Sequence, residues 1–303
     1  MADEPRVVRL DTLREFIKPL RVEPGRKVRL PHDYDTAYKP DNLDKKDAGP
    51  LLARGIELLA EYQARLAAQD TYGLLVVFQA MDAAGKDGTI KHVMSGINPQ
   101  GVEVSSFKVP STEELDHDYL WRYAKRMPGR GTIGIFNRSY YEECLVVRVH
   151  KEILLGQHLP KSAKRGDVWS RRFREINDWE RYLTDNGIRI VKLFLNLSRE
   201  EQKARFLSRI AEPERNWKFS AADIRERQHW DDYQKAFSEV LSNTSTEHAP
   251  WYVIPADRKW LMRVAAAAVI LDELVRIDPK FPVIDEAART AMLEAKAELL
   301  AEE

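Results

Sequence analysis

The alternation of apolar and polar residues predicts strands and helices in turn along most of the chain. Short apolar runs bounded by turn residues are typical of buried strands, and apolar residues three and four apart are typical of amphipathic helices. Strands are predicted at 74–78, 102–109, 132–136, 189–197 and 251–255. Helices are predicted at 10–20, 51–69, 87–95, 113–126, 140–154, 170–185, 199–210, 221–243 and 259–277. This order predicts an α/β fold, with a mainly parallel five-stranded sheet and helices on both faces.

Prolines and glycines indicate how the chain is divided. They interrupt residues 21–50, yet this segment contains apolar side chains such as Val28. We therefore expect 1–50 to be an extension packed on a core domain formed by 51–280. Residues 281–303 are expected to form a helical tail.

The first predicted strand leads into a segment with the features of a phosphate-binding loop. Residues 80–85 are mostly small, Lys86 follows, and a helix begins directly after it. Backbone N–H groups at a helix N-terminus lack partners, the helix dipole favours an anion there, and Lys86 adds a full positive charge. The expected phosphate ligands are Ala83, Ala84, Gly85, Lys86, Asp87, Gly88 and Thr89.

This loop departs from the pattern Gly-x-x-x-x-Gly-Lys-Ser/Thr. Ala80 replaces the first glycine, and Asp87 replaces the residue that binds Mg²⁺. Asp82 places a carboxylate where it would repel a phosphate unless a cation lay between them, so we interpret it as a Mg²⁺ ligand. The alternative is an ordinary strand–turn–helix in which Gly85 and Lys86 occur together by coincidence.

Ligands of such sheets bind beyond the carboxyl ends of the strands. Lys108 lies near the end of the second predicted strand, and the third is followed by Asn-Arg-Ser-Tyr-Tyr-Glu-Glu at 137–143. The candidate nucleotide ligands there are Asn137, Arg138, Tyr141 and Glu142, of which Glu142 is also a candidate metal ligand. Asn137 stands where related enzymes place a metal-binding Asp, but it could instead only cap the next helix.

The charge distribution is neutral overall and uneven locally. With 48 basic and 48 acidic residues, the formal charge is zero, so no global field favours a nucleic acid. Residues 119–141 contain no carboxylate, and 161–174 contain six basic residues and one acidic residue. Such runs usually line a solvated surface, but two of them beside a phosphate loop predict a track for a polyanion. The candidate ligands are Lys108, Arg122, Lys125 and Arg126.

The segment 205–230 is a candidate lid. Arg205 and Arg209 lie four residues apart and share a helical face, and Lys218 follows a proline-containing interruption. Basic side chains on a mobile segment are a common means of neutralising a transferring phosphoryl group. The alternative is a salt-bridged surface helix, because four glutamates lie between residues 200 and 214.

Other features limit the class of protein. A single cysteine, Cys144, excludes an internal disulfide and fits a reducing compartment, and its apolar neighbours predict an inert thiol. The N-terminus lacks the apolar segment of a secretory signal, and the longest apolar run, 264–271, is too short to span a bilayer. We expect a cytoplasmic protein without membrane or nucleic-acid partners. His92, His117 and His150 form no zinc pattern and are expected to be structural.

Three motifs resemble those of the family-2 polyphosphate kinases. They are MDAAGKDGTIKHVMSG at 81–96, FNRSYYEE at 136–143 and RNWKFS at 215–220, in the family's order, and the likeness extends over 10–280. The resemblance implies a thymidylate-kinase-like P-loop fold, a three-layer sandwich with a helical lid. It also implies that Asp82 and Lys86 serve metal and phosphate binding.

The resemblance further implies an activity. Family members transfer a phosphoryl group between inorganic polyphosphate and a nucleotide with Mg²⁺, and Mn²⁺ is the other candidate ion. AMP, ADP and ATP are the implied nucleotides, with guanine nucleotides as further candidates, and the implied assembly is a homodimer or homotetramer. The form Asn137-Arg138-Ser139 with Glu142 resembles class III, which accepts both AMP and ADP. Because many members have Asp-Arg-Ser and Asn at these places, the metal ligands of this motif stay open.

Transfer of this kind needs positioning and electrostatic stabilisation but no nucleophilic side chain. The candidate catalytic residues are Asp82, Lys86, Arg138, Glu142, Arg205, Arg209 and Lys218. Two other functions use the same fold: an ATP-dependent kinase, and a switch that binds a nucleotide without transfer. A GTPase would require an Asn-Lys-x-Asp motif, and no Asn-Lys pair occurs in the chain.

Overall fold

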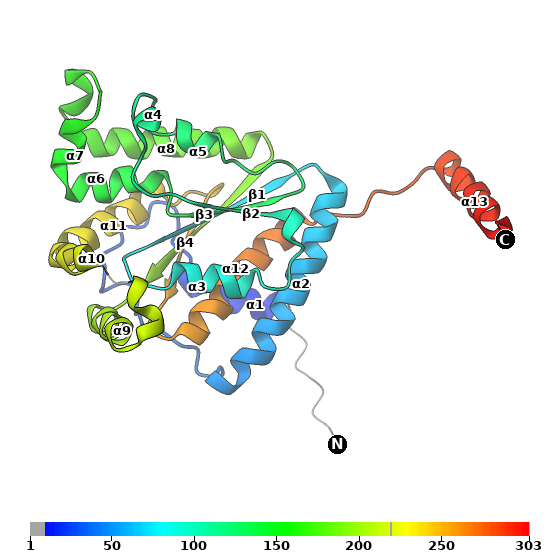
Figure 1. The fold of residues 1–303 in the computed structure, drawn as a ribbon, viewed down its shortest axis with the longest axis horizontal. Coiled ribbons are helices and arrows are strands. Elements are labelled where there is room, and N and C mark those ends of the chain that lie inside the picture. The colour runs from blue at the N-terminus through cyan, green and yellow to red at the C-terminus, as the bar shows by residue number, and fades with distance from the viewer. Residues whose placement is uncertain (1–9, 219, 303) are drawn as a thin grey trace.

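A parallel sheet lies at the centre of the computed structural model, which describes residues 10–218 and 220–302 (Figure 1). Its five strands stand in the order β2-β3-β1-β4-β5, and all neighbouring pairs are parallel. They are β1 (Gly73–Ala80), β2 (Val102–Ser106), β3 (Ile133–Asn137), β4 (Ile188–Asn196) and β5 (Trp251–Pro255). The sheet confirms the predicted α/β fold and each predicted strand.

The register of the sheet places its functional segments together. Strand β1 is buried at every position, as expected for an apolar strand covered on both faces. Phe78 of β1 pairs with Asn137 of β3, and Ala80 pairs with Leu195 of β4. The carboxyl ends of three neighbouring strands therefore meet at one edge, where the loop after β1 begins.

Helices cover both faces of the sheet (Figure 1). One face packs against α1 (Leu10–Ile17), α2 (Ala48–Gln69), α3 (Lys86–Val93) and α12 (Lys259–Ile277). The other packs against α6 (Val146–Val149), α8 (Val168–Asp185) and α11 (Trp230–Thr244). The apolar run 264–271 lies in α12 and is buried in the first of these two cores. Among the residues that the structure describes, no helix has the length and apolar character needed to cross a membrane.

Three predicted helices are wrong as continuous elements. Residues 113–126 form α4 (Thr112–Leu115) and α5 (Trp121–Ala124), because the Asp118 side chain accepts a bond from the Leu120 N–H and competes with helical bonding. The other broken segments are η4 (Tyr140–Cys144), α6 and α7 (Lys151–Gly156), and α10 (Ala221–Glu226), η7 (Arg227–His229) and α11. Side chains beside these breaks are fixed by tertiary contacts: Tyr140 bonds Glu180, and Glu226 bonds His150.

The remaining elements lie in connections and at the ends. They are α9 (Arg199–Ala211), α13 (Glu286–Ala301), η1 (Lys18–Leu20), η2 (Lys45–Asp47), η3 (Pro99–Gly101), η5 (Lys161–Lys164) and η6 (Pro213–Lys218). The N-terminal extension packs on the domain, since the Val22 N–H donates to the Trp251 carbonyl at 2.9 Å and Asn196 donates to the Tyr34 carbonyl at 3.0 Å. Helix α13 extends away from the body of the molecule (Figure 1).

Candidate active site

The loop between β1 and α3 curls at two left-handed residues. Ala83 has φ 62° and Gly85 has φ 102°. A Cβ atom at Gly85 would also lie 3.2 Å from the Met262 methyl group, so glycine suits both the conformation and the space. The first N–H groups of α3 then begin directly at the loop, without intrahelical partners. This arrangement is suited to an anion.

Lys86 lies within the curl of this loop. Its Nζ donates to the Ala80 carbonyl at 2.9 Å, so the ammonium group reaches back to the end of β1. Desolvation and then the nearby Arg138 charge lower the pKa of Lys86 to about 8. Among the residues that the structure describes, no carboxylate forms an ion pair with this ammonium group, and an anionic ligand would supply such a partner.

Arg205 stabilises the loop from behind. Its guanidinium donates to the Ala84 carbonyl at 2.6 Å, to the Ala83 carbonyl at 3.2 Å and to the Ala256 carbonyl, and it pairs with Glu201. These contacts involve all three guanidinium nitrogens, and the residue is 7% exposed. The expectation that Arg205 meets a phosphate directly is therefore corrected: in this structure it positions the loop.

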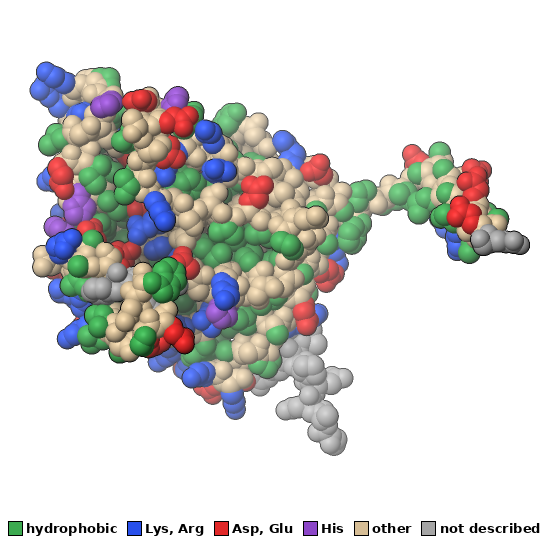
Figure 2. All heavy atoms as spheres, viewed as in Figure 1, with side chains coloured by type: hydrophobic (Ala, Val, Ile, Leu, Met, Phe, Trp, Pro, Cys, Tyr) green, Lys and Arg blue, Asp and Glu red, His purple; other side chains and the backbone are tan. Residues whose placement is uncertain are grey.

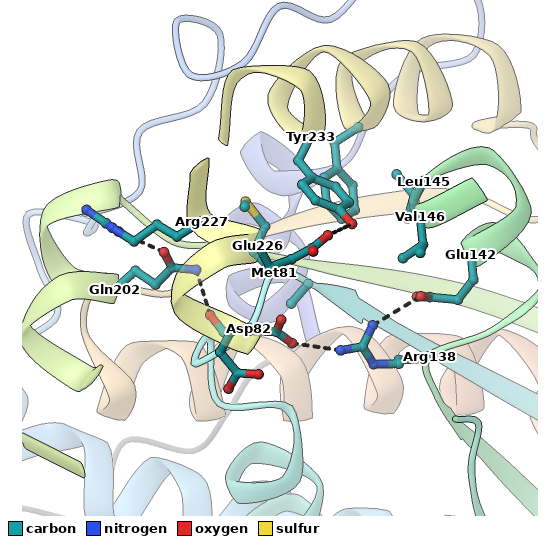
Figure 3. Close-up of a pocket in the computed structure, with 13 residues that line it drawn as sticks. Met81, Asp82, Arg138, Glu142, Leu145, Val146, Gln202, Glu226, Arg227 and Tyr233 are labelled. Carbon is teal, nitrogen blue, oxygen red and sulfur yellow. Dashed lines mark hydrogen bonds and ion pairs between the residues drawn. The ribbon is translucent and has the colours of Figure 1, made fainter. Parts of the chain in front are cut away.

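Arg138 joins the loop to the end of β3 (Figure 3). One terminal nitrogen lies 2.7 Å from Asp82 and the other 3.0 Å from Glu142. Its backbone adopts φ 65°, unusual for a residue with a side chain, and its N–H donates to the Phe78 carbonyl at 3.0 Å. The Glu142 charge, more than that of Asp82, raises the pKa of Arg138. Three predicted site residues thus lie together.

Sequence reasoning missed Gln79, whose Nε2 donates to Glu142 at 3.0 Å. The signal was available, because Gln79 is a polar residue in an otherwise apolar strand. A buried polar side chain needs a partner, and here the partner is a site carboxylate.

Asp82 and Glu142 fit a divalent metal. Their side chains are 28% and 23% exposed and flank one guanidinium. Mg²⁺ is typically bound through one or two carboxylates, with phosphate oxygens and water completing the octahedron. Within residues 10–218 and 220–302, no group of three or more His, Cys, Asp or Glu side chains is arranged to hold a metal by itself. The site therefore suits a metal that arrives with a phosphate.

Asn137 and its neighbours connect the site to the core. The Asn137 amide donates to Asp87 at 2.6 Å, linking the end of β3 to the start of α3. It does not cap the next element, because Ser139 does so by accepting from the Tyr141 N–H. The expectation that Tyr141 contacts a nucleotide is corrected as well. That side chain is fully buried, and its hydroxyl donates to Glu180 at 2.9 Å.

A small pocket lies between the loop and the lid segment (Figure 3). Asp82, Arg138 and Glu142 line one side, and Asp223, Glu226 and Tyr233 line the other. The pocket has a volume of about 30 Å³, far below that of a typical ligand site. A nucleotide therefore does not fit inside this pocket in the conformation described.

The basic candidates on the lid segment are only partly described. Arg209 lies 3.7 Å from Asp223, an ion pair that joins α9 to α10. Burial, and next the Asp82 charge, raise the pKa of Asp223. The side chain of Lys218 lies outside the described residues, so its predicted role stays a prediction.

The predicted polyanion track is not continuous. Arg122 is corrected, because its side chain is only 9% exposed, pairs with Glu114 and lies over Phe107 and Tyr123. Lys108, Lys125 and Arg126 are exposed, and Lys125 also lies over the Trp121 ring. Cys144 is buried, and burial raises the pKa of its thiol. His92 bonds the Gly88 carbonyl and His150 bonds Glu226, as expected of structural histidines.

Comparison with known proteins identifies the family. The family model for polyphosphate kinase 2 matches residues 42–282. An ADP-polyphosphate phosphotransferase of Rhodopseudomonas palustris is 48% identical, with 93% of this chain and 98% of the relative covered. An AMP/ADP-polyphosphate phosphotransferase of Meiothermus ruber is 39% identical, with 92% and 100% covered. The crystal structure of polyphosphate kinase 2 from Arthrobacter aurescens TC1 superposes with a TM-score of 0.77 at 37% identity, covering 91% of this chain and 98% of that one. The chain is a phosphotransferase of the polyphosphate kinase 2 family.

Proposed function

We propose that the protein transfers the terminal phosphoryl group of inorganic polyphosphate to AMP and ADP, reversibly and with Mg²⁺. The observation that carries the proposal is the position of Lys86 in a curled loop directly beside the Asp82–Arg138–Glu142 cluster. The names of the Rhodopseudomonas and Meiothermus relatives support polyphosphate as donor and ADP and AMP as acceptors. We also propose that the protein is located in a reducing cytoplasm and forms a homo-oligomer.

The donor binds to the loop through its terminal phosphate. Free N–H groups at the start of α3 and the Lys86 ammonium group hold that phosphate against the loop. Arg205 keeps the loop carbonyls turned away from the phosphate by bonding them itself. No covalent intermediate with the protein is required, because the acceptor oxygen attacks the phosphorus in line and the shortened polyphosphate leaves.

The acceptor approaches from the β3 side. Arg138 directly follows β3, and it is fixed by two carboxylates that a metal or a phosphate could compete for. Asp82 and Glu142 would hold the Mg²⁺, which would neutralise charge on the phosphate oxygens when bound. We infer that closure of the lid segment brings Lys218 to the transferring group, beside Arg209 of α9, and excludes water.

The decisive experiment compares donors. Purified protein is incubated with Mg²⁺ and either AMP or ADP, with polyphosphate or ATP as donor, and the nucleotides formed are separated. Formation of ADP and ATP from polyphosphate supports the proposal. The matched variant Lys86→Ala should lose activity while Lys91→Ala, an exposed residue of the same helix, retains it. Transfer from ATP but not from polyphosphate would make the protein an ordinary nucleotide kinase.

A further inference from the structure

Gln79 occupies a core position at the border of the active site. Leu75 and Val77 belong to the core between the sheet and α8, and Gln79 points to the same face, since alternate residues of a strand share a face. The next two residues, Ala80 and Met81, line the active-site pocket. Figure 2 shows charged side chains spread over the surface, where water can bond them. Gln79 is 1% exposed, so its amide depends on protein partners.

Only one end of this amide has a partner. The Gln79 Nε2 donates to Oε1 of Glu142 at 3.0 Å. The Gln79 Oε1 is buried, and within residues 10–218 and 220–302 it accepts no hydrogen bond. A buried carbonyl without a donor destabilises a folded protein, and an apolar side chain of the same size would avoid that loss. The stability of the fold therefore does not account for a glutamine here, and the bond to Glu142 is the remaining explanation.

Two donors hold the Glu142 carboxylate, one on each oxygen. Arg138 donates to Oε2 at 3.0 Å, and Gln79 donates to Oε1. The Arg138 side chain is 33% exposed and also bonds Asp82, so a phosphate that enters the site can compete for its guanidinium. Gln79 is buried in a central strand and has no other partner to turn to. When a phosphate engages Arg138, Gln79 is thus the donor that keeps Glu142 in place.

The chemistry of an amide suits the support of a metal ligand. Hydrogen bonds from neighbouring residues orient the ligands of bound metals, and the loss of one typically weakens metal binding by about 10- to 100-fold. A glutamine donates to one carboxylate oxygen without adding a positive charge that would repel a cation. We propose that Gln79 is a positioning residue, which fixes Glu142 in the orientation that binds the divalent metal. The inference rests on the metal site of the proposed function.

The test separates metal binding from folding. Gln79→Met replaces the amide with an apolar chain of similar size. Its matched control is Gln63→Met, because Gln63 is 3% exposed and lies against Gly101, at the end of β2 opposite to the site. Glu142→Gln and the double variant Gln79→Met/Glu142→Gln complete the set. Water-proton relaxation enhancement measures Mn²⁺ binding with saturating ADP and without polyphosphate, so that no transfer occurs, and thermal melting measures stability.

Gln79→Met should raise the Kd for Mn²⁺ by about tenfold or more. Its melting temperature should stay within about 2 °C of the wild type, because the variant removes an unpaired carbonyl together with one hydrogen bond. Gln63→Met should change the Kd by less than about twofold, whatever its stability. Adding Gln79→Met to Glu142→Gln should also change the Kd by less than about twofold, since the carboxylate that Gln79 positions is already absent.

Activity supplies a further measurement. In Gln79→Met, the Mg²⁺ concentration that gives half-maximal rate should rise, while kcat at saturating Mg²⁺ should recover to within about twofold of the wild type. A lower melting temperature with unchanged Mn²⁺ affinity would show a purely structural glutamine and overturn the inference. An equal effect of Gln79→Met with and without the Glu142 carboxylate would overturn it too, as would a wild type that binds no Mn²⁺. If the wild type binds Mn²⁺ but transfers nothing from polyphosphate, the proposed function fails, and the Mn²⁺ titrations still decide the role of Gln79.

Discussion

Lys192 and Glu180 form an ion pair in which neither side chain is exposed, with 2.6 Å between Nζ and Oε2. The same carboxylate group accepts hydrogen bonds from the hydroxyl groups of Tyr140 and Tyr141, and the ammonium group also donates to the Thr244 carbonyl. The two tyrosines directly follow the segment that contains Arg138. The pair therefore holds the second site motif in place from the core side.

Breaking this pair should destabilise the protein strongly. We expect Lys192→Met to lower the free energy of unfolding by about 3–5 kcal/mol, because Glu180 is left as an uncompensated buried charge. The double variant Lys192→Met/Glu180→Gln should recover much of the loss, since the amide is neutral and can still bond a tyrosine. Urea denaturation of Lys192→Met, Glu180→Gln and the double variant measures this. A double variant as unstable as the sum of its single changes would contradict the explanation.

The pKa of Lys86 predicts a pH dependence. Since this pKa is lowered to about 8 from 10.5, the free enzyme loses the phosphate-binding charge above that pH, and kcat/KM should fall by up to about tenfold per pH unit. Bound polyphosphate favours the ammonium form, so the fall in kcat should occur at higher pH. The folded state binds fewer protons than the unfolded state between these two pKa values, so this residue's contribution to stability rises with pH there. Coincident pH profiles for kcat and kcat/KM would contradict the role assigned to Lys86.

Glu142 is expected to set how short an acceptor can be. Accepting both AMP and ADP requires the acceptor or its metal to shift by one phosphate, and a carboxylate can hold a metal where an amide supplies no charge. Glu142→Asn should therefore reduce kcat/KM for AMP more than for ADP, with polyphosphate saturating. The control variant Glu142→Gln also removes the charge, but it keeps the length of the side chain that contacts Arg138 and Gln79. If the ratio of the two values stays unchanged, Glu142 only supports the local structure.

Asp82→Asn should weaken metal binding more than folding. Asp82 is partly exposed, so losing its pair with Arg138 should cost about 1 kcal/mol or less. Activity should fall strongly and recover in part as Mg²⁺ is raised, because phosphate oxygens still supply ligands. Titration of activity with Mg²⁺, with Mn²⁺ in parallel, gives the shift in apparent affinity. An absence of recovery at any metal concentration would show that Asp82 does more than bind the ion.

The sequence predicted what local patterns determine. The structures of β1 and of the loop before Lys86 were predicted because they depend on neighbouring residues, an apolar run and a series of small residues. The rule that ligands bind beyond the carboxyl ends of parallel strands also predicted that Asp82, Arg138 and Glu142 lie together. The break of the helix predicted at 140–154 has no signal in the local pattern, although the backbone leaves helical geometry at Leu145 and at His150. The function of a charged side chain likewise depends on the partners that the fold places around it. In the sequence, Arg122 and Arg205 resemble cations that are available to a ligand. In the fold, the Arg122 guanidinium lies over the Phe107 ring, and the Arg205 guanidinium donates to the Ala84 carbonyl.

Two buried polar residues have a signal in the sequence. Gln79 and Lys192 each interrupt an apolar strand, and a buried polar group needs a partner nearby. The sequence indicates that a partner exists but not which one.

The bonds that Arg205 makes to the Ala83, Ala84 and Ala256 carbonyls have a mechanical consequence. They fasten α9 to the loop and to the end of β5, so this helix belongs to the rigid frame, although it lies partly within the predicted lid. The hinge of any closing movement then lies after α9, where Glu212 has the extended conformation φ −104°, ψ 106°. Opening would swing η6 and α10 alone, and the phosphate cradle would keep its shape whether the enzyme is empty or loaded.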